Sequence, residues 1–524
     1  MRRFGAVVSL VVGFLGGQSP AEARPLRIIH TNDLHSFMEE ADAPGSGGYA
    51  AVKATIDRLK AEARDRGMDT LVLDAGDFSE GNEFFFADEG RTSWSIMDQM
   101  GYDAVAIGNH DFLVGLGQMD KILSSVKPTT PFLSANLTID PQAKVPALRR
   151  HVKPYVELNR AGVKIAVLGL LTDELVYRWR LDKADLTPPD FEARSHVPAL
   201  RNRNDFVIVL SHLGFNVDIG LARAVDGVDL IVGGHSHTTL ETPFPAPNRL
   251  GGRVPIVQVG QHGRLVGDLV VDVEPGKPMK VLSYRLVPVF KDAGGDALID
   301  RRVAQARVQL EDRYGKEWLY KVIGISEIPL EQPLLQSTNW GNYCADSFMN
   351  AAGADLALDV GEFYGNTRPA GFVTREDLIS MYPRTFDTRK ASGWNVWTIR
   401  APGWLIRYVL ETAANSSLHL NTAGVTFERT KDPKTGKVGL RKIRIKGRKL
   451  RALREYTLAV TEGIGRGALE LSTVLALFFQ PRDTGIPVWA SIENHIRSQG
   501  GRIRAPASMP TAISSNAEAA SLLQ

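Results

Sequence analysis

The stretch Leu26-Arg-Ile-Ile-His-Thr-Asn-Asp-Leu-His35 decides the fold class that this sequence predicts. It begins with a short β-favouring apolar run and ends in an Asp-x-His tripeptide, Asp33-Leu-His35. Apolar runs that end in a short polar cluster recur further along the chain. The later clusters are Gly76-Asp77, Gly108-Asn109-His110-Asp111, Ser211-His212 and Gly233-Gly234-His235-Ser236-His237. This ordered series indicates a site assembled from the ends of several strands.

The apolar runs alternate with helical patterns between residues 26 and 288. Residues 26–30, 70–74, 104–107, 163–168, 206–210 and 229–232 are typical of short strands. Residues 49–66 carry Val52, Ile56, Leu59 and Ala63 at helical spacing. Alternating strands and helices predict a layered α/β domain, in which ligands bind beyond the carboxyl ends of the strands. Residues 254–259 and 264–273 are expected to be two further strands that close a second sheet.

The polar clusters supply the side chains that hold divalent cations. Asp and His bind borderline divalent ions, and a bridging carboxylate can hold two of them about 3.5–4 Å apart. Asp77 follows a glycine, which lets the backbone approach the ions, and Asn109 offers a neutral oxygen. A single Asp-x-His tripeptide is common by chance, whereas five ordered clusters are not. The sequence therefore predicts a metal-dependent phosphoester hydrolase whose candidate ligands are Asp33, His35, Asp77, Asn109, His212, His235 and His237.

Length and composition indicate a soluble protein with more than one domain. The 524 residues are too many for a single core, and 44% hydrophobic with 23% charged residues is an ordinary globular composition. The formal net charge of +3 gives no reason to expect a nucleic-acid partner. Cys344 is the one cysteine of the sequence, so an intrachain disulfide is impossible. The expected partner is a small phosphoester, and no stable membrane anchor is expected.

The N-terminus has the pattern of a secretory signal. A short basic start, Met1-Arg2-Arg3, precedes a mostly apolar stretch at 6–17 and an A-x-A site, Ala21-Glu22-Ala23. The apolar stretch is short for a bilayer span, which disfavours the alternative of an N-terminal anchor. We expect residues 1–23 to be removed and the mature protein to be periplasmic or secreted.

The motifs resemble those of a known family. Asp33-Leu-His35, Gly76-Asp77-Phe-Ser-Glu-Gly81, Gly108-Asn109-His110-Asp111, His212 and Gly234-His235-Ser-His237 are similar to the metallophosphoesterase (calcineurin-like) signature. Residues 29–35 and Gly47-Gly-Tyr-Ala50 resemble the periplasmic 5′-nucleotidase family in particular. Ser337-Thr-Asn-Trp-Gly-Asn342 with Ala345-Asp346 resembles the opening of that family's C-terminal substrate domain.

The resemblance implies a four-layer α/β/β/α metallophosphoesterase domain followed by a second α/β substrate domain. We place the first domain at 24–290, a connector helix at 291–323, the second domain at 324–498 and a disordered tail at 499–524. By resemblance, two divalent ions (Mn, Zn, Fe or Co) occupy two ligand sets that share Asp77. The first set is Asp33, His35, Asp77 and His237, and the second is Asp77, Asn109, His212 and His235. His110 and Asp111 are the candidate catalytic residues, and Asn109 is also a candidate substrate contact.

The sequence departs from the family pattern beside the catalytic histidine. The family carries an Asp three residues after the histidine that matches His110, and the two work as a dyad. Here that position is Leu113, and Asp111 leaves the chain in a different direction. Either another group orients His110, or its protonation is tuned differently.

The substrate loops of the second domain depart further. Residues 359–368 replace the family's glycine-rich loop with its arginine, and they end in Arg368. Arg368 and Arg384 are the candidate substrate-binding arginines. Gly463 and Leu469 stand where the family offers a phenylalanine and an aspartate to the nucleoside. The nearby aromatic residues are either replacements for the lost stacking group or core packing; they are Phe363, Tyr364 and Phe386.

Three functions stay open on these grounds. The first is an exported dimetal phosphohydrolase that acts on nucleotides or related phosphoesters. The second uses the same metal chemistry on another substrate: a sugar phosphate, a cyclic phosphodiester or a thiosulfate-type ester. The third is a non-catalytic binding protein that keeps the fold, although the complete ligand set argues against it.

Overall fold

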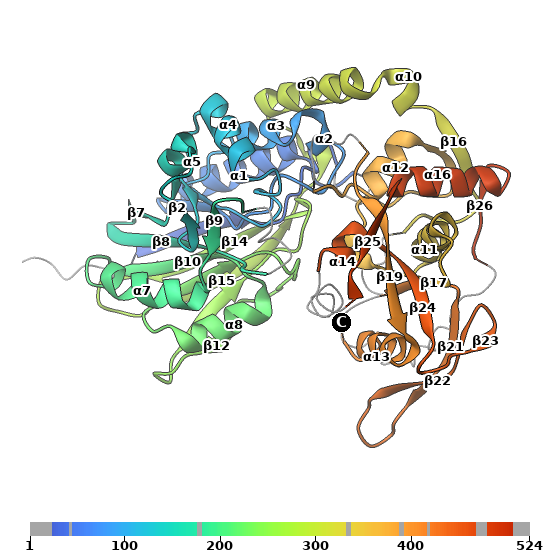
Figure 1. The fold of residues 1–524 in the computed structure, drawn as a ribbon. Helices are drawn as coiled ribbons and strands as arrows, with labels where there is room; N and C mark the ends of the chain where they lie inside the picture. The colour runs from blue at the N-terminus through green and yellow to red at the C-terminus, as the bar shows by residue number, and fades with distance from the viewer. Residues whose placement is uncertain are drawn as a thin grey trace, which may run out of the picture.

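The computed structural model describes residues 24–40, 45–174, 181–331, 337–386, 392–416, 420–467 and 479–506. The predicted signal segment, Leu469 and most of the predicted tail lie outside these residues. Figure 1 shows two bodies that lie side by side, with the long helix α9 (Ala297–Tyr314) running above both. In the described part of the chain, no helix combines the length and the apolar composition that a membrane span requires.

The first sheet of the N-terminal body is built around β1 (Arg24–Thr31). Its strand order is β15 (Lys280–Pro288), β14 (Leu265–Val273), β1, β2 (Asp69–Asp74), β3 (Ala104–Ala106), β4 (Phe132–Leu133) and β6 (Val152–Lys153). The strands from β1 to β6 are parallel, and Ile28 of β1 lies opposite Leu71 of β2. The carboxyl ends of β1, β2 and β3 therefore meet at one edge of the sheet.

The second sheet has a parallel centre of four strands. Its order is β12 (Phe244–Pro247), β13 (Arg253–Val257), β11 (Leu230–Gly233), β10 (Phe206–His212), β8 (Val163–Leu171) and β7 (Tyr155–Arg160). Buried apolar residues from both sheets pack between them, among them Leu26, Leu71, Ile165, Ile208 and Leu230. The two sheets thus lie face to face.

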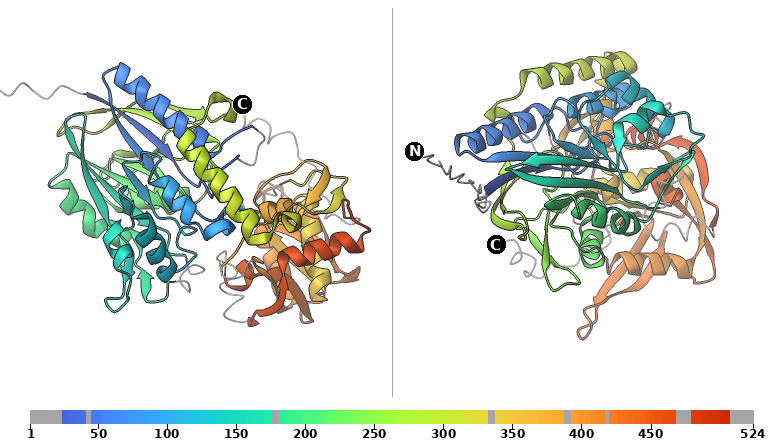
Figure 2. Two further views of the ribbon diagram at one scale, coloured as in Figure 1. Left: turned by 90° about the horizontal axis from the view of Figure 1, so that it is seen from above. Right: turned by 90° about the vertical axis from the view of Figure 1, so that its left-hand side faces the viewer.

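Helices cover the outer faces of both sheets. On the first sheet, α1 (Tyr49–Asp65), α3 (Arg91–Met97) and α4 (Leu116–Val126) contribute to one buried cluster. On the second, α7 (Pro189–Arg201) and α8 (Phe215–Ala224) contribute to another. Helix α1 forms as predicted, because Val52, Ile56, Leu59 and Ala63 make one buried stripe. The four-layer α/β/β/α prediction is confirmed, and Figure 2 shows the layers from two further sides.

One strand lies in a different sheet from the one predicted. Residues 254–259 and 264–273 were expected to close a second sheet together. β13 does lie in the second sheet, but β14 pairs antiparallel with β1 in the first, with Leu269 opposite Ile28. The edge of β1 that β2 leaves open accepts β14. Leu269 and Val271 then enter the core between the sheets.

The C-terminal body begins after the connector helix α9. The side chain of Asp296 caps this helix, accepting hydrogen bonds from the N–H groups of Leu298 and Ile299. A short helix, α10 (Lys316–Leu319), leads into β16 (Val322–Ser326). The central sheet of this body has the order β20 (Leu420–Ala423), β17 (Leu356–Val360), β24 (Glu455–Thr461), β19 (Asn395–Pro402) and β25 (Arg482–Pro487).

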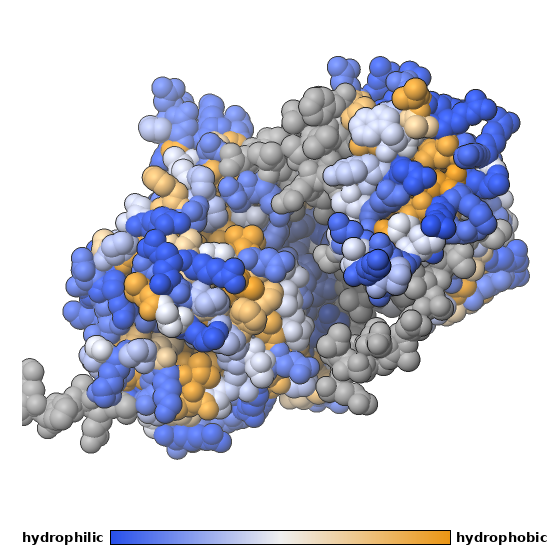
Figure 3. Space-filling view, turned by 90° about the horizontal axis from the view of Figure 1, so that it is seen from below, coloured by the Kyte–Doolittle hydropathy of each residue, from blue (hydrophilic) through white to orange (hydrophobic). Residues whose placement is uncertain are grey.

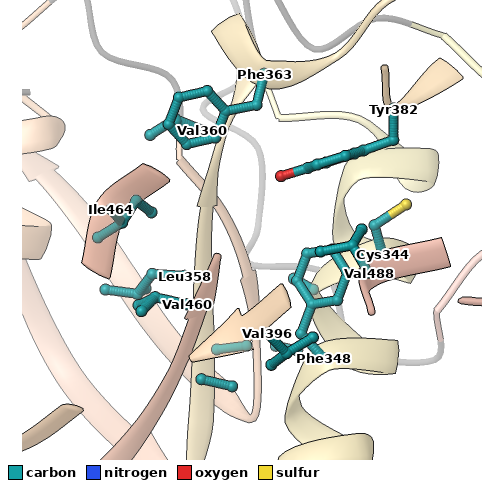
Figure 4. Packing of buried hydrophobic residues seen from close by; sticks show 14 of the residues in the cluster. Cys344, Phe348, Leu358, Val360, Phe363, Tyr382, Val396, Val460, Ile464 and Val488 are labelled. Carbon is teal, nitrogen blue, oxygen red and sulfur yellow. The ribbon is translucent and has the colours of Figure 1, made fainter. Parts of the chain in front are cut away.

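Helices and two smaller sheets complete the C-terminal body. The helices are α11 (Asn339–Ala352), α12 (Arg375–Met381), α13 (Gly403–Ala413), α14 (Glu462–Gly465) and α16 (Val488–Ser498). The smaller sheets are β18 (Gly371–Thr374)-β16-β26 (Arg502–Ile503) and β21 (Val425–Lys431)-β22 (Val438–Ile445)-β23 (Arg448–Lys449). Figure 4 shows Phe348 of α11 and Val488 of α16 in the core of this body. The predicted tail begins too early, because β26 pairs with β16 and belongs to the fold.

Ion pairs and aromatic contacts join the two bodies. Arg307 of α9 pairs with Glu39 of the N-terminal body at 2.8 Å and with Glu376 of the C-terminal body. The rings of Phe86 and Trp489 meet edge to face, with centroids 5.2 Å apart. Phe86 and Leu113 also belong to the same buried cluster as the C-terminal core.

Candidate two-metal active site

The polar clusters lie at the carboxyl ends of strands from both sheets. Asp33 and His35 follow β1, Asp77 follows β2, and Asn109 follows β3. His212 is the last residue of β10, and His235 and His237 follow β11. Because these strands run parallel within each sheet, their ends gather at one edge. The two packed sheets thus supply the site jointly.

The backbone at this edge departs from ordinary geometry. Five of the predicted ligands have positive φ angles: Asp33 (53°), His35 (49°), Asp77 (57°), His235 (73°) and His237 (52°). Side chains disfavour this region, and residues that are held there cluster at active sites and ligand clamps. The fold therefore keeps these side chains in conformations that the local sequence does not favour.

The side chains meet in two groups. In one, ligand atoms of Asp33, His35 and His237 all lie within 4.8 Å of one another, and in the other those of Asp77, His212 and His235 do. Asp77 lies between the groups: its Oδ2 atom is 2.9 Å from Nε2 of His212 and 3.9 Å from Nε2 of His35. Oδ1 of Asn109 is 3.2 Å from Nε2 of His212, beside the second group. These positions suit a carboxylate shared by two cations.

Backbone carbonyls fix the orientation of two imidazoles. Nδ1 of His35 lies 2.6 Å from the carbonyl oxygen of Glu80, and Nδ1 of His212 lies 2.7 Å from that of Ala75. A carbonyl oxygen can only accept, so each Nδ1 donates its proton. Both Nε2 atoms then face the site, as is usual for metal-binding histidines.

The charges of the groups also suit cations. Burial lowers the pKa of His35 well below its usual value and so keeps this ring neutral. Burial opposes ionisation of Asp77, yet His212 and His110 hold its pKa well below the usual range. Burial lowers the pKa of His212, but Asp77 outweighs this and raises it to about 10. The proton between Asp77 and His212 lies where a cation would bind, and the donor set fits Mn, Zn, Fe or Co.

His110 lies beside the ligand groups, and a residue that the sequence analysis missed orients it. Its Nε2 atom is 4.0 Å from Oδ2 of Asp77, and its Nδ1 atom is 2.5 Å from Oε2 of Glu80. The Glu80 carboxyl is fully buried, which raises its pKa, but Arg384 and His110 outweigh this and hold the pKa below its usual value. A buried carboxylate thus holds the ring of His110.

Asp111 has a supporting position. Its Oδ2 accepts hydrogen bonds from the backbone N–H groups of Asp77 (2.9 Å) and Gly108 (2.7 Å). Its Oδ1 accepts from those of Phe78 and Ser79, both at 3.0 Å. With both oxygens occupied by backbone groups, Asp111 holds the Asp77 loop rather than facing the ligand groups. This geometry replaces the predicted catalytic role of Asp111 with a structural one.

The two candidate arginines have different surroundings. Nη1 of Arg384 lies 2.9 Å from Oε2 of Glu80, so Arg384 reaches the site from the C-terminal body. Arg368 instead pairs with Asp377 at 2.8 Å and is 38% exposed. The structure thus brings Arg384, but not Arg368, to the metal-ligand groups.

Two acidic residues of the site escaped the sequence analysis. Glu80 lies within the Gly76–Gly81 motif, whose length alone does not say which side chain turns toward His110. Glu174 follows β8, and its Oε1 atom is 3.0 Å from Nε2 of His235. Its place after a parallel strand was the one available signal, because the other clusters occupy equivalent places.

The aromatic residues near the substrate loops form core packing. Trp394 contacts the rings of Phe363 and Phe386, with both centroid separations at 4.8 Å. Phe363, Tyr364 and Phe386 are all buried. A Cβ atom at Gly463 would lie 2.4 Å from Cη2 of Trp394. Trp394 thus fills the space beside Gly463, where the resemblance expects a phenylalanine.

A hollow separates the two bodies on the face drawn in Figure 3, and the surface inside it is hydrophilic. Contacts that cross between the bodies, such as that of Arg384 with Glu80, lie in the same part of the molecule as the ligand groups.

Family models place the chain among the phosphoesterases. Residues 26–239 match the model of the calcineurin-like phosphoesterases, and residues 322–475 match that of the 5′-nucleotidase C-terminal domain. Together the two models cover more than half of the chain. The chain therefore belongs to the calcineurin-like metallophosphoesterases. Within that class, it belongs to the two-domain 5′-nucleotidase family, which confirms the resemblance found in the sequence.

One relative agrees with this placement in sequence, and two solved structures share the fold. The snake venom 5′-nucleotidase of Naja atra is 31% identical over 330 residues, which is 56% of this chain and 58% of that protein. The match thus spans less than two thirds of the relative's length. Among solved structures, the 5′-nucleotidase precursor of Thermus thermophilus has a TM-score of 0.75 at 23% identity, covering 92% of this chain and 98% of that one. The sulfate thiohydrolase SoxB of Thermus thermophilus has a TM-score of 0.71 at 19% identity, covering 94% and 97%.

Proposed function

We propose that this protein is an exported dimetal phosphohydrolase that releases phosphate from nucleotides or related phosphoesters. The observation that carries the proposal is the position of Asp77 between two groups of cation ligands. Membership of the 5′-nucleotidase family supports the reaction class. The signal pattern at 1–23 supports export.

The candidate ligands form two sets, one for each cation. Asp33, His35 and His237 with Asp77 would hold one cation, and His212, His235 and Asn109 with Asp77 would hold the other. When bound, two divalent cations polarise phosphoryl oxygens and lower the pKa of a water molecule, which can then attack near neutral pH. Ligand groups that are already oriented by backbone carbonyls lose little freedom on binding.

His110 is the proposed catalytic residue. Its Nε2 atom points toward the ligand groups, where the phosphoryl group of a substrate would lie. In-line transfer spreads negative charge over the phosphoryl oxygens, which a nearby imidazole N–H can stabilise. The same N–H can donate its proton to the leaving oxygen.

A second candidate concerns the substrate and not the reaction. The family's stacking position is Gly463, and the neighbouring aromatic rings are packed into the core. Base–aromatic stacking is worth about 1–3 kcal/mol per base, so its loss weakens selection for a nucleoside. This observation favours a smaller or different ester, such as a sugar phosphate, a cyclic phosphodiester or a thiosulfate-type ester.

One experiment tests both candidates. Purified protein loaded with Mn²⁺ is offered 5′-nucleotides, cyclic nucleotides, sugar phosphates, an aryl phosphate and a thiosulfate ester in parallel. The proposal predicts phosphate release from at least one phosphoester and no release by the protein stripped with chelator. Cleavage of the non-nucleotide esters alone would select the second candidate. Failure on every ester at full metal loading would make the chain a binding protein.

A further inference from the structure

Glu80 connects the two bodies at the candidate active site. Its Oε2 atom lies 2.5 Å from Nδ1 of His110 and 2.9 Å from Nη1 of Arg384. Its Oε1 atom accepts a hydrogen bond of 3.3 Å from the backbone N–H of Thr385. The residue is 0% exposed. A single buried side chain therefore contacts His110 on one side and two residues of the C-terminal body on the other.

These contacts settle the direction of the hydrogen bond to His110. Arginine is a donor only, and its permanent positive charge beside Glu80 favours the ionised carboxylate. An ionised carboxylate can only accept, so Nδ1 of His110 is the donor. Nε2 is then the atom left to face Asp77, at 4.0 Å. Glu80 thus determines which nitrogen of His110 the substrate would meet.

Arg384 is itself held in place. Its Nε atom donates to the carbonyl oxygen of Phe363 at 3.1 Å, and Nη2 donates to that of Glu362 at 2.8 Å. The residue is 7% exposed. With three of its nitrogens engaged, Arg384 is a support for Glu80 more than a free clamp for a substrate.

The side chain of Leu113 contributes to core packing and offers no carboxylate to His110. Leu113 is buried in the apolar cluster that it shares with the C-terminal core. The carboxylate that pairs with His110 therefore comes from the loop after β2 and not from position 113. This arrangement answers the question that the sequence left open about how His110 is oriented.

We propose that Glu80 is the positioning residue of His110 and that the C-terminal body completes the arrangement through Arg384. The inference rests on the proposed phosphohydrolase function, because His110 is taken to act on the phosphoryl group. The orientation of His110 in the first domain then depends on the second domain, because His110 is fully held only while Arg384 contacts Glu80.

The first test is kinetic. Glu80→Gln keeps the shape of the side chain but removes its charge, so we expect kcat to fall about 10²- to 10³-fold, within the range of a general acid–base contribution. KM and the metal content should stay close to wild type. Glu83→Gln is the matched control. Glu83 is also buried, but its carboxylate lies 3.7 Å from Arg307 and serves that residue, so kcat should not change. Unchanged kcat in Glu80→Gln, or loss of metal, would overturn the proposal.

A double-mutant cycle asks whether Glu80 acts through His110. Coupled residues are non-additive, so Glu80→Gln should cost nothing further in a His110→Ala background. An equal fall in both backgrounds would show that Glu80 acts independently of His110. Arg384→Gln should lower kcat with little change in KM and add little to Glu80→Gln. A raised KM with unchanged kcat would instead make Arg384 a substrate clamp.

A spectroscopic readout separates this proposal from the function on which it rests. In protein with ¹⁵N-labelled histidine, the His110 signal, assigned by its loss in His110→Ala, should show a protonated Nδ1. In Glu80→Gln that signal should shift, while Glu83→Gln leaves it unchanged. This measurement needs no substrate, so it decides the role of Glu80 even if no ester is cleaved. If the His110 Nδ1 signal has the same chemical shift in Glu80→Gln as in wild type, the proposal is contradicted.

Discussion

Oδ2 of Asp77 lies 2.9 Å from Nε2 of His212, and both side chains are buried. Without a cation the two groups share a proton, and Asp77 raises the pKa of His212 to about 10, against the effect of burial. The position of this proton is the one that a cation bound by the second group would take. Binding of a cation here would therefore release this proton.

This relationship predicts pH-dependent metal affinity. Below pH 10, a cation must displace the His212 proton, so affinity should rise as pH increases from about 6 to about 9. Calorimetric titration with Mn²⁺ in buffers of different ionisation enthalpy should show release of about one proton from this group per protein. Affinity that does not change with pH would contradict the shared-proton geometry.

His110→Ala should remove most turnover and leave the metal site intact. His110 belongs to neither ligand group, so metal content measured by elemental analysis should equal that of wild type. We expect kcat to fall about 10²- to 10⁴-fold, the usual size of a general acid–base contribution. His196→Ala is a suitable control, since His196 lies on α7 and pairs with Glu192. A fully active His110→Ala enzyme would refute the catalytic role.

Asp111→Asn should destabilise the protein, because an amide has one acceptor oxygen where the carboxylate has two. Asp111 accepts hydrogen bonds from four backbone N–H groups, and in the variant two of these groups would face the NH₂ donor of the amide. The expected loss in the free energy of unfolding is roughly 2–6 kcal/mol, from a penalty of about 1–3 kcal/mol for each of the two unsatisfied buried groups. Urea denaturation measures it. The exposed Asp57→Asn should cost no more than about 1 kcal/mol, and equal losses in the two variants would argue against the supporting role.

Gly463→Ala tests how tightly the rings pack beside the lost stacking position. The new Cβ would lie 2.4 Å from Cη2 of Trp394 and 3.0 Å from Cζ of Phe363. Overpacking a buried site costs about 1–3 kcal/mol, so the urea midpoint should fall. Gly220→Ala on α8 meets no atom within 4 Å and should instead stabilise by about 0.5–1 kcal/mol. A stable Gly463→Ala protein that gains affinity for nucleosides would show that the space is open.

The sequence predicted the layered domain and the grouping of the ligands for one physical reason. Parallel strands end at a common edge, so polar residues after Thr31, Asp74 and Ala106 must lie near one another. Their motif spacing then resembled a known family. The sheet to which each strand belongs was harder to predict. β14 lies in the first sheet because the free edge of β1 accepts it, and the local composition of β14 does not encode that pairing.

The contacts of His110 depend on tertiary structure alone. Glu80 and His110 are 30 residues apart, and Arg384 is 304 residues from Glu80. Neither separation matches the period of a helix or a strand, so no sequence pattern reveals the contact. Asp111 shows the converse, because its place beside His110 in sequence suggested catalysis, whereas its oxygens bind backbone N–H groups. Sequence adjacency gives the loop, and packing decides the direction of each side chain.

The most direct test of the central claim is the metal stoichiometry of the purified protein after loading with Mn²⁺ and desalting. Two ions per chain are expected in wild type. Asp77→Asn should retain at most one, because a neutral amide oxygen bridges two cations poorly. Arg368 pairs with Asp377 and belongs to neither ligand group, so Arg368→Gln should retain both ions. Wild-type protein that keeps no more than a trace of metal, or an Asp77→Asn protein that keeps two ions, would contradict the account.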